Sequence, residues 1–271
     1  MPWSSAHISW LTKTDDNIKS KDGKPIDVYK FSHTEDDKIL TAWAKHFRNH
    51  YCLDSEIDFY REGYKYSRSE YLSNIKFPDQ SATPGPSIRA GDFAEILVAD
   101  YLEFILNYWV PRTRYGNKTI RNESTKGSDI LGCKFYNDKE TINDTLAIFE
   151  AKAQFSGTRP TARLQDAIDD SVKDQIRKAE SLNAIKQRLF EGNQKSESLK
   201  INRFQNPDDK PYTETSGAAA LFLTNLLDTT ILQEADTSPH PNSKNLSLIV
   251  IHGEDLMNLV HKLYKRAADE A

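Results

Sequence analysis

A glutamate and a lysine stand two residues apart in an otherwise apolar segment, Thr145 to Phe155 (TLAIFEAKAQF). The continuous apolar character of this segment predicts a buried β-strand. Because side chains alternate between the two faces of a strand, Glu150 and Lys152 project from the same face as Leu146 and Ile148. Burying either charge without compensation costs several kcal/mol. We therefore expect the pair to meet each other, a metal ion or solvent in a cleft.

A second carboxylate, Asp129, precedes Glu150 and lies at the start of another predicted strand, Ser128 to Tyr136 (SDILGCKFY). If the two strands form an antiparallel hairpin, Asp129 and Glu150 approach each other across it. Two close carboxylates repel unless a cation lies between them, and oxygen ligands completed by water suit Mg²⁺ or Mn²⁺. Two plainer interpretations stay open. Asp129 could be a turn-forming residue after a glycine, and Glu150 with Lys152 an ordinary ion pair on an exposed strand end.

A third carboxylate, Glu95, lies on a helix predicted over Gly91 to Trp109. The residues three, four and seven positions after it are apolar: Val98, Ala99 and Leu102. This stripe predicts that the Glu95 carboxylate points toward the core side of the helix, where it needs a partner. The alternative is a glutamate near the helix boundary that reaches solvent. The combination of a helix acid, a strand acid and a Glu-x-Lys strand is a more specific indication of a metal site than any one of these features alone.

The other elements indicate an α/β fold, with a central mixed sheet flanked by helices. Helical patterns cover residues 39–51, 161–190 and 254–268, and an apolar run at 246–251 predicts a last buried strand. The segment Phe77 to Ser87 is rich in proline and predicts an irregular connection. We therefore expect a small N-terminal subdomain over residues 1–80, which offers a docking surface, and a main domain over residues 86–271.

A basic stretch lies directly before Asp129, between Pro111 and Gly127, with five basic residues against one acid. Phosphate contacts are the natural use of such a stretch, although a solvated basic loop is the plainer alternative. The predicted DNA contacts are Arg112, Arg114, Lys118, Arg121 and Lys126, with Arg89 as a weaker candidate.

The composition limits the remaining possibilities. A net charge of −4 over 271 residues argues against a basic coat, but it allows a local basic patch. The sequence contains no apolar run of about eighteen residues and no secretion signal, so we expect a cytoplasmic protein without membrane contact. Cys52 and Cys133 lack paired spacing and are expected to be free thiols. His46 and His50 are four residues apart but have no second ligand pair, which disfavours a zinc site.

These motifs resemble the PD-(D/E)XK nuclease superfamily. Its helix acid, strand acid and (D/E)-x-K pattern are matched by Glu95, Asp129 and Glu150-Ala151-Lys152. Gln154 extends the last motif to E-A-K-A-Q, as in some members, whereas no proline precedes Asp129. The resemblance covers about residues 89–156 and implies a restriction-endonuclease-like core.

More narrowly, the segments R-A-G-D-F-A-E-I-L, G-S-D-I-L-G and F-E-A-K are similar to the nuclease subunit of the Hachiman antiphage defence system. That subunit works beside a helicase. The resemblance implies a Mg²⁺- or Mn²⁺-dependent deoxyribonuclease with DNA and a helicase as partners. Asp129, Glu150 and Glu95 would hold the metal, and Lys152 and Gln154 would complete the catalytic set. Two other functions stay open: a catalytically silent nuclease fold that binds DNA or regulates a helicase, and a stand-alone restriction endonuclease.

Overall fold

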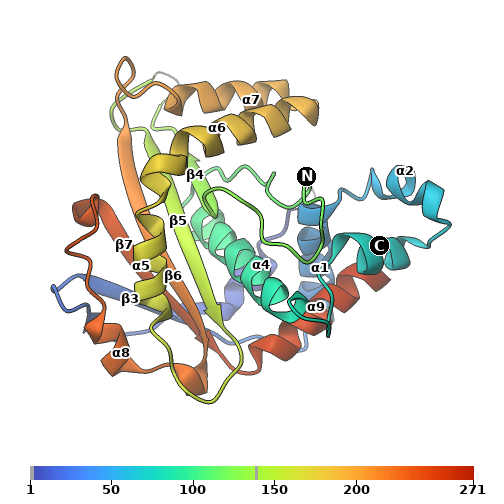
Figure 1. Ribbon diagram of the computed structural model, residues 1–271, viewed down its shortest axis with the longest axis horizontal. Helices are drawn as coiled ribbons and strands as arrows, with labels where there is room; N and C mark the ends of the chain where they lie inside the picture. The colour runs from blue at the N-terminus through green and yellow to red at the C-terminus, as the bar shows by residue number, and fades with distance from the viewer. Residues whose placement is uncertain (1–2, 138–139) are drawn as a thin grey trace.

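The computed structural model describes residues 3–137 and 140–271. A mixed seven-stranded sheet lies at its centre, with the strand order β1-β3-β7-β6-β5-β4 and with β2 paired to β3 (Figure 1). The strands are β1 (Leu11–Lys13), β2 (Ile18–Lys19), β3 (Pro25–Phe31), β4 (Ile130–Lys134), β5 (Thr145–Gln154), β6 (Thr213–Leu223) and β7 (Leu246–Gly253). The α/β fold with a central mixed sheet is therefore confirmed.

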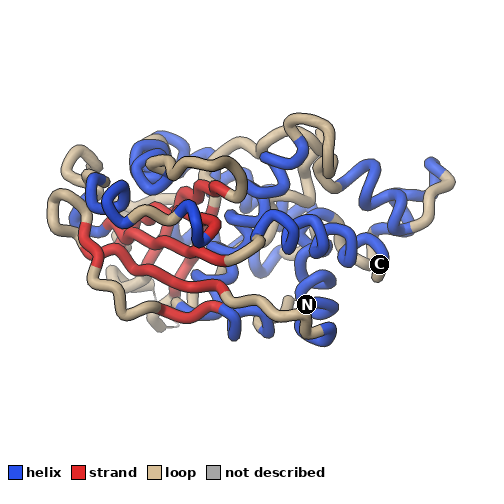
Figure 2. The backbone as a smooth tube through the Cα atoms, turned by 90° about the horizontal axis from the view of Figure 1, so that it is seen from below, coloured by secondary structure: helices blue, strands red, loops and turns tan. Residues whose placement is uncertain are grey.

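Parallel pairing joins β5, β6, β7 and β3, whereas β4 is antiparallel to β5 and the two short strands β1 and β2 are antiparallel to β3. The sheet is curled, and helices lie against both of its faces (Figure 2). The N-terminal strand β3 is hydrogen-bonded to β7 along its length. Residues 11–31 thus share one sheet with the rest of the chain.

The helices form two outer layers. On one face, α1, α4 and α9 pack with sheet residues into the largest apolar core. On the other face, α5 and α8 cover the middle of the sheet, and α6 covers β4 and β5. The α-helices are α1 (Asp37–Tyr51), α2 (Ile57–Arg61), α3 (Arg68–Tyr71), α4 (Gly85–Asp100), α5 (Arg163–Ser171), α6 (Asp174–Glu191), α7 (Lys195–Lys200), α8 (Thr229–Glu234) and α9 (Leu256–Asp269). Within the described ranges, none of these helices has the length and apolar character needed to span a bilayer.

The alternation predicted for β5 is present. Leu146 and Ile148 pack under α6, whereas Ala147, Phe149 and Ala151 face the core beneath α4. Glu150 and Lys152 follow the first set, so their side chains leave the sheet on the face that α5 and α6 cover. This places an acid and an amine at the point where the apolar cover of β5 ends.

Two sequence predictions need correction. The helix expected from Gly91 begins at Gly85, inside the segment expected to be irregular, because Pro86 occupies its first turn, where a missing N–H costs nothing. The single helical pattern expected over residues 161–190 is two helices, α5 and α6, separated after Ser171. Strands β3 and β6 lie in segments for which no strand was predicted.

Candidate active site

The β4–β5 hairpin leaves part of one edge of β5 uncovered. Pairing with β4 stops where Ile130 meets Phe149, so Glu150 and the residues after it have β6 on one side and no β4 residue on the other. Asp129, the residue directly before β4, turns back over this open edge. Its Oδ2 accepts a hydrogen bond from the backbone N–H of Ala151 at 3.3 Å. The antiparallel hairpin predicted from the sequence thus places Asp129 beside the Glu-x-Lys segment.

The turn before Asp129 is fixed by backbone conformation and by α6. Gly127 has a φ of +97°, in the left-handed region that side chains disfavour. The N–H of Ser128 then donates to the Oγ of Ser181 on α6 at 3.1 Å. These two features hold Asp129 in place on a segment that has no regular secondary structure of its own.

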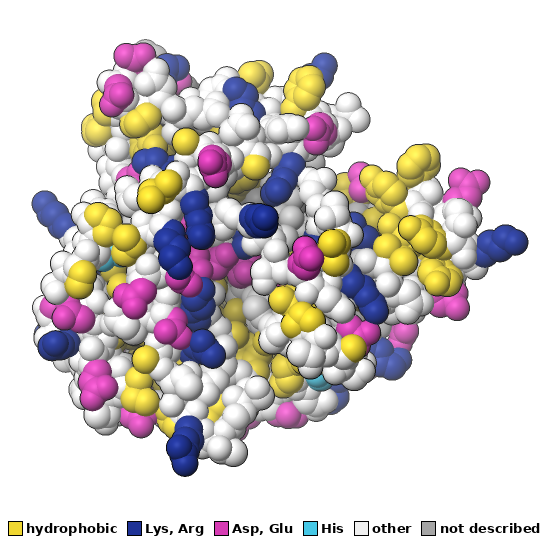
Figure 3. Space-filling view, in the orientation of Figure 1, with side chains coloured by type: hydrophobic (Ala, Val, Ile, Leu, Met, Phe, Trp, Pro, Cys, Tyr) yellow, Lys and Arg dark blue, Asp and Glu magenta, His cyan; other side chains and the backbone are white. Residues whose placement is uncertain are grey.

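A cavity of about 1110 Å³ opens at this edge of β5. Its wall contains all five residues of the predicted catalytic set: Glu95, Asp129, Glu150, Lys152 and Gln154. Figure 3 shows a hollow in the region where α4 and α5 face each other in Figure 1, with acidic side chains at its centre and basic ones around it. Helix, turn and strand therefore contribute charged groups to one open cleft.

Lys152 is held between two acids. Its Nζ lies 2.7 Å from Oε1 of Glu150 and 2.6 Å from Oδ2 of Asp170 on α5. These neighbours raise the pKa of Lys152 against the opposing effect of burial, so the amine stays protonated. The other carboxylate oxygen of Glu150, Oε2, is buried and has no hydrogen-bond partner among the described residues.

Glu95 and Asp129 are bridged by one guanidinium. Nε of Arg114 lies 2.7 Å from Oε2 of Glu95, and Nη2 lies 2.6 Å from Oδ1 of Asp129. The hydroxyl of Tyr115 also donates to Glu95. The partner that the apolar surroundings of Glu95 require is thus supplied by residues from the basic stretch.

Burial dominates the electrostatics of these acids. It raises the pKa of Glu95 to about 8, and the nearby Asp129 adds to the rise while Arg114 opposes it. It likewise raises the pKa of Glu150 to about 8, again with Asp129 adding and Lys152 opposing. Burial therefore disfavours the charged form of both carboxyls, an effect that a cation bound beside them would oppose.

A further acid, Asp174, was not predicted from the sequence. It begins α6, and its side chain is buried. Burial raises the pKa of Asp174 to about 6, a hydrogen bond with the side chain of Ser128 lowers it, and the nearby Asp129 raises it. No motif in the sequence singles it out from the other acids on and before α6.

The family model HamA matches residues 5–267. The chain belongs to the HamA family. HamA is a component of the Hachiman defence system, so the narrower of the two sequence resemblances is confirmed. No curated protein matches the chain.

Three of the basic residues predicted to contact DNA, namely Arg89, Arg112 and Lys118, are buried in this HamA chain. Arg89 is buried, donates to the carbonyl of Pro78 and stacks over the Tyr264 ring. The side chains of Arg112 and Lys118 are each 3% exposed, and Lys118 is paired with Asp92 at 2.7 Å. Arg112 and Lys118 thus neutralise interior carboxylates, and all three of these basic side chains lie inside the protein.

The other three predicted DNA contacts, Arg114, Arg121 and Lys126, have different partners and exposure. Arg121 is partly exposed and paired with Asp79 at 3.0 Å, and Arg114 bridges acids as described above. Lys126 is exposed and lines the cleft. The sequence reading missed Arg163 and Arg177, which reach the same cleft from α5 and α6.

Gln154 lines the cleft, but its amide serves the following loop. Its Nε2 donates to the carbonyl of Arg159 at 2.8 Å, and its Oε1 accepts from the backbone and hydroxyl of Thr161 at 3.1 and 2.8 Å. All three of these hydrogen bonds run to the loop between β5 and α5. They tie the chain that leaves β5 to the start of α5.

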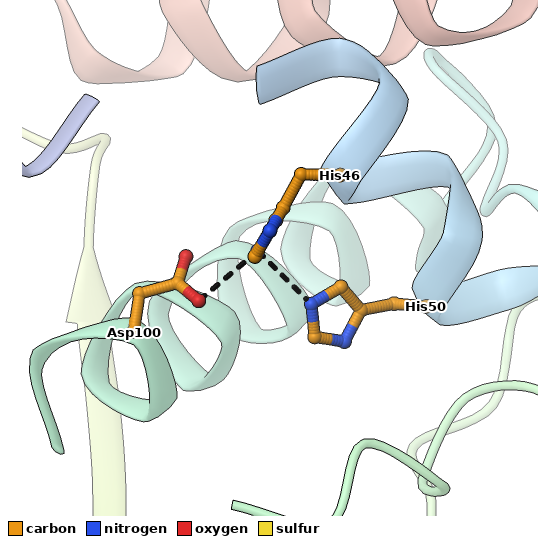
Figure 4. A group of neighbouring side chains, drawn as sticks. All are labelled: His46, His50 and Asp100. Atoms are coloured by element: carbon orange, nitrogen blue, oxygen red, sulfur yellow. Dashed lines mark hydrogen bonds and ion pairs between the residues drawn. The ribbon is translucent and has the colours of Figure 1, made fainter. Parts of the chain in front are cut away.

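A second polar cluster lies away from the cleft. His46 and His50 of α1 and Asp100 of α4 bring ligand atoms within 4.8 Å of one another, so the group could hold a metal ion (Figure 4). The sequence suggested only the two histidines, because Asp100 comes from a distant helix. Arg112 is present at the same place. Its Nη2 lies 2.7 Å from Oδ1 of Asp100 and its Nη1 lies 2.9 Å from Nε2 of His50.

The hydrogen bonds of this cluster assign its protons. Nδ1 of His46 accepts from the N–H of Ser4 at 3.1 Å, so its Nε2 carries the proton, and this Nε2 lies 3.0 Å from Oδ1 of Asp100. Nε2 of His50 accepts from Arg112 and is therefore unprotonated. Burial, with Arg112 as the next cause, keeps the pKa of His50 well below its usual value. The cluster is an electrically balanced network in which a guanidinium stands where an ion would.

Proposed function

We propose that this HamA chain is a Mg²⁺-dependent deoxyribonuclease, the effector of a Hachiman complex that works beside a helicase in the cytoplasm. The observation that carries the proposal is the convergence of Asp129 and the Glu150–Lys152 pair at the open edge of β5. An α/β sheet with this hairpin, and with Glu95 on the preceding helix, is similar to the helix-acid, strand-acid and (D/E)-x-K arrangement of the PD-(D/E)XK superfamily, which supports the proposal.

The donor groups of the cleft fit a hard divalent cation. Asp129, Glu150 and Glu95 offer only carboxylate oxygens, the ligands that Mg²⁺ and Mn²⁺ prefer. The unpartnered Oε2 of Glu150 and the burial that raises the pKa values of Glu95 and Glu150 support a cation at this place. When bound, such an ion would activate a water and neutralise charge on the scissile phosphate. The histidine cluster fits it less well, because two of its three ligand residues offer imidazole nitrogens, which suit Zn²⁺ rather than Mg²⁺.

The chain's own residues then have distinct tasks. Lys152, fixed between Glu150 and Asp170, presents a protonated amine that would orient the attacking water or stabilise the phosphate as negative charge develops. Asp129 holds the backbone of Ala151 through its hydrogen bond and so fixes the strand that carries both groups. Gln154 would act indirectly, by fixing the loop that closes one side of the cleft.

Nucleic-acid contacts are assigned to the cations that remain accessible around the cleft. Lys126 comes from the turn before β4, and Arg163 and Arg177 come from the opposite wall. Cations on both sides of an acidic centre would hold a phosphate backbone across it. The net charge of −4 is compatible with this use, because only a local basic surface is needed.

The N-terminal residues 1–80 are proposed to dock the helicase partner. An aromatic cluster, which we define as Phe59, Tyr60 and Tyr64, is exposed on α2 and the turn that follows it. It lies where α2 projects from the body of the molecule, and apolar side chains gather there in Figure 3. A projecting group of exposed aromatic side chains is typical of a protein-binding surface.

Cleavage of plasmid DNA in the presence of Mg²⁺ tests the proposal, with the chain alone and with its helicase subunit. We expect weak cutting by the chain alone and stronger cutting by the activated complex. Glu150→Gln and Lys152→Ala should each abolish cutting, whereas Glu191→Gln, an exposed acid at the end of α6, should not change it. Retained cutting in both cleft variants would reject this site.

Two alternatives predict other outcomes of the same assay. A catalytically silent module would bind DNA without cutting it under any of these conditions. A stand-alone restriction endonuclease would cut vigorously at defined sequences without the helicase. The intact set of Asp129, Glu150 and Lys152 favours the cutting complex, since a silent copy has no need of all three.

A further inference from the structure

The amine of Lys152 is held by two carboxylates that come from different elements. Glu150 precedes it on β5, and Asp170 lies in the last turn of α5. Nζ of Lys152 is 2.7 Å from Oε1 of Glu150 and 2.6 Å from Oδ2 of Asp170. An ammonium group has three N–H donors, and in the described part of the chain no third acceptor lies within hydrogen-bonding distance of this amine. One donor is therefore left for a group in the cleft.

The packing of α5 fixes the position of Asp170. Leu164, Ala167 and Ile168 lie on one face of the helix and are buried against the middle of the sheet. This packing sets the rotation of the helix and with it the direction of the Asp170 side chain. Asp170 is not part of the cleft wall, whereas Lys152 is. The carboxylate of Asp170 therefore reaches the cleft only through the amine that it holds.

The helix itself gains nothing from an acid at this place. A carboxylate in the last turn of a helix faces the negative end of the helix dipole, which disfavours it. Asp170 pairs there with Lys152 and with Lys173, which follows it three residues later. Burial raises the pKa of Asp170, but the hydrogen bonds from these two amines lower it further, so the pKa lies below its usual value. The carboxylate is therefore charged, and its contacts are with amines rather than with the helix.

The two acids that hold Lys152 would respond differently to a metal ion. Oε2 of Glu150 is buried and has no hydrogen-bond partner within residues 3–137 and 140–271. A divalent ion bound to Glu150 would become the largest local charge and would weaken the attraction between Glu150 and the amine. Asp170 is outside the proposed ligand set and would keep its hold. This matters because a lysine amine sits on a flexible stem and needs a fixed partner to stay in one place.

We propose that Asp170 is a positioning residue, which keeps the Lys152 amine directed into the cleft when a divalent ion engages Glu150. The inference rests on the proposed function of the cleft. It adds α5, which lies outside the three motifs, to the elements on which the reaction depends. Asp170 itself would touch neither the metal nor the scissile phosphate.

Magnetic resonance of the lysine ammonium groups in the ¹⁵N-labelled full chain tests this without any measurement of cleavage. An ammonium held by ion pairs gives a sharp signal, whereas a mobile one is lost through exchange with water. Lys152→Arg identifies the signal, which the wild-type chain should show with and without Mg²⁺. Asp170→Asn should keep the signal without Mg²⁺, because Glu150 still holds the amine, and should lose it when Mg²⁺ is added.

Two further variants serve as controls. Asp170→Glu keeps a carboxylate at the same place and should restore the signal with Mg²⁺. Asp169→Asn removes the neighbouring acid, which accepts a hydrogen bond from Gln165 at 2.8 Å and does not contact Lys152, and it should behave like the wild type. The melting temperature of Asp170→Asn should stay close to that of the wild type, since the change removes an acid from the end of a helix.

Cleavage by the activated complex gives a second, independent readout. Asp170→Asn should lower kcat by about 10- to 100-fold, the usual effect of losing a residue that orients an active-site group. KM should not change, because Asp170 does not contact the substrate. Asp170→Glu should recover part of kcat, whereas equal losses in both variants together with lower melting temperatures would show a merely structural role and overturn the inference.

The results also separate failure of the inference from failure of the proposed function. A Lys152 signal that persists with Mg²⁺ in Asp170→Asn, or an unchanged kcat, would overturn the inference. Binding of Mn²⁺ to the wild-type chain, measured by electron paramagnetic resonance and abolished by Glu150→Gln, would in that case leave the proposed metal site standing. Binding that survives Glu150→Gln, or no binding at all, would overturn both.

Discussion

Replacing Arg112 by alanine tests whether the histidine cluster is a balanced charge network or a metal site. Asp100 is fully buried, and Arg112 is its only fixed cation among the contacts described. Removal of one partner of a buried ion pair costs about 3–5 kcal/mol, because the remaining charge stays buried without compensation. With about 2–4 °C per kcal/mol for a chain of this size, the melting temperature should fall by roughly 6–20 °C.

The assay is thermal unfolding followed by fluorescence, without metal and with Zn²⁺. Without Arg112, the ligand atoms of His46, His50 and Asp100 become available, and Zn²⁺ should restore part of the lost stability. His50→Ala in the Arg112→Ala background should remove this rescue. Arg163→Ala, which removes an exposed pair with Asp166, is the matched control and should cost about 0–1 kcal/mol.

Two results would refute the reasoning. If Arg112→Ala lowers the free energy of unfolding by less than about 1 kcal/mol, then Asp100 is neutral or solvated, contrary to the ion pair described. A rise of several degrees when Zn²⁺ is added to the wild-type chain would show that an ion displaces Arg112. In that case the cluster would be a metal site in its own right.

The other predictions concern stability and partner binding. Because the pKa of buried His50 lies well below that of the unfolded chain, stability should fall as pH drops below about 6.5, by up to about 1.4 kcal/mol per pH unit. Thermal unfolding at pH 7.5 and 5.5 measures this, and His50→Gln should reduce the slope. A Cβ at Gly217 would overlap the ring of Phe149, so Gly217→Ala should destabilise by about 1–3 kcal/mol in urea unfolding. Phe59→Glu combined with Tyr60→Glu should weaken capture by the helicase subunit without lowering the melting temperature, and unchanged capture would reject the aromatic cluster as its docking surface.

Local patterns predicted the hairpin that positions the cleft. The alternation in β5 is an intrinsic property of a strand, so the common face of Glu150 and Lys152 followed from the sequence alone. Asp129 was predicted beside them because a short antiparallel hairpin fixes its own register once the strands are recognised. These inferences needed no knowledge of the rest of the chain.

Strand β6 shows why the rest could not be predicted. Its centre is Gly217-Ala218-Ala219-Ala220, residue types with weak strand preference. It forms a strand because β5 and β7 pair with both of its edges and because small residues leave room for the ring of Phe149. This is tertiary context, which a local pattern does not contain. The short strand β3 likewise depends on β7, which lies more than 200 residues away.

The basic stretch shows the same limit for the site. The charge pattern between Pro111 and Gly127 identified a basic segment, but it could not show which of the basic side chains point into the protein interior. Arg112 and Lys118 do so because Asp100 and Asp92, both on α4, are buried and need cations. The direction of a basic side chain was decided by acids outside the segment.

Arg112 and Arg114 lie two residues apart on one loop, and their surroundings give them different freedom. Arg112 is enclosed by Asp100, Glu103 and His50, and Trp3 packs against its guanidinium, so its release would leave several buried groups without a partner. Arg114 faces the open cleft, where its guanidinium bridges Glu95 of α4 and Asp129. The first arginine therefore anchors the loop in the protein interior, and the second anchors it at the proposed active site. Both directions were decided by carboxylates that the loop itself does not contain.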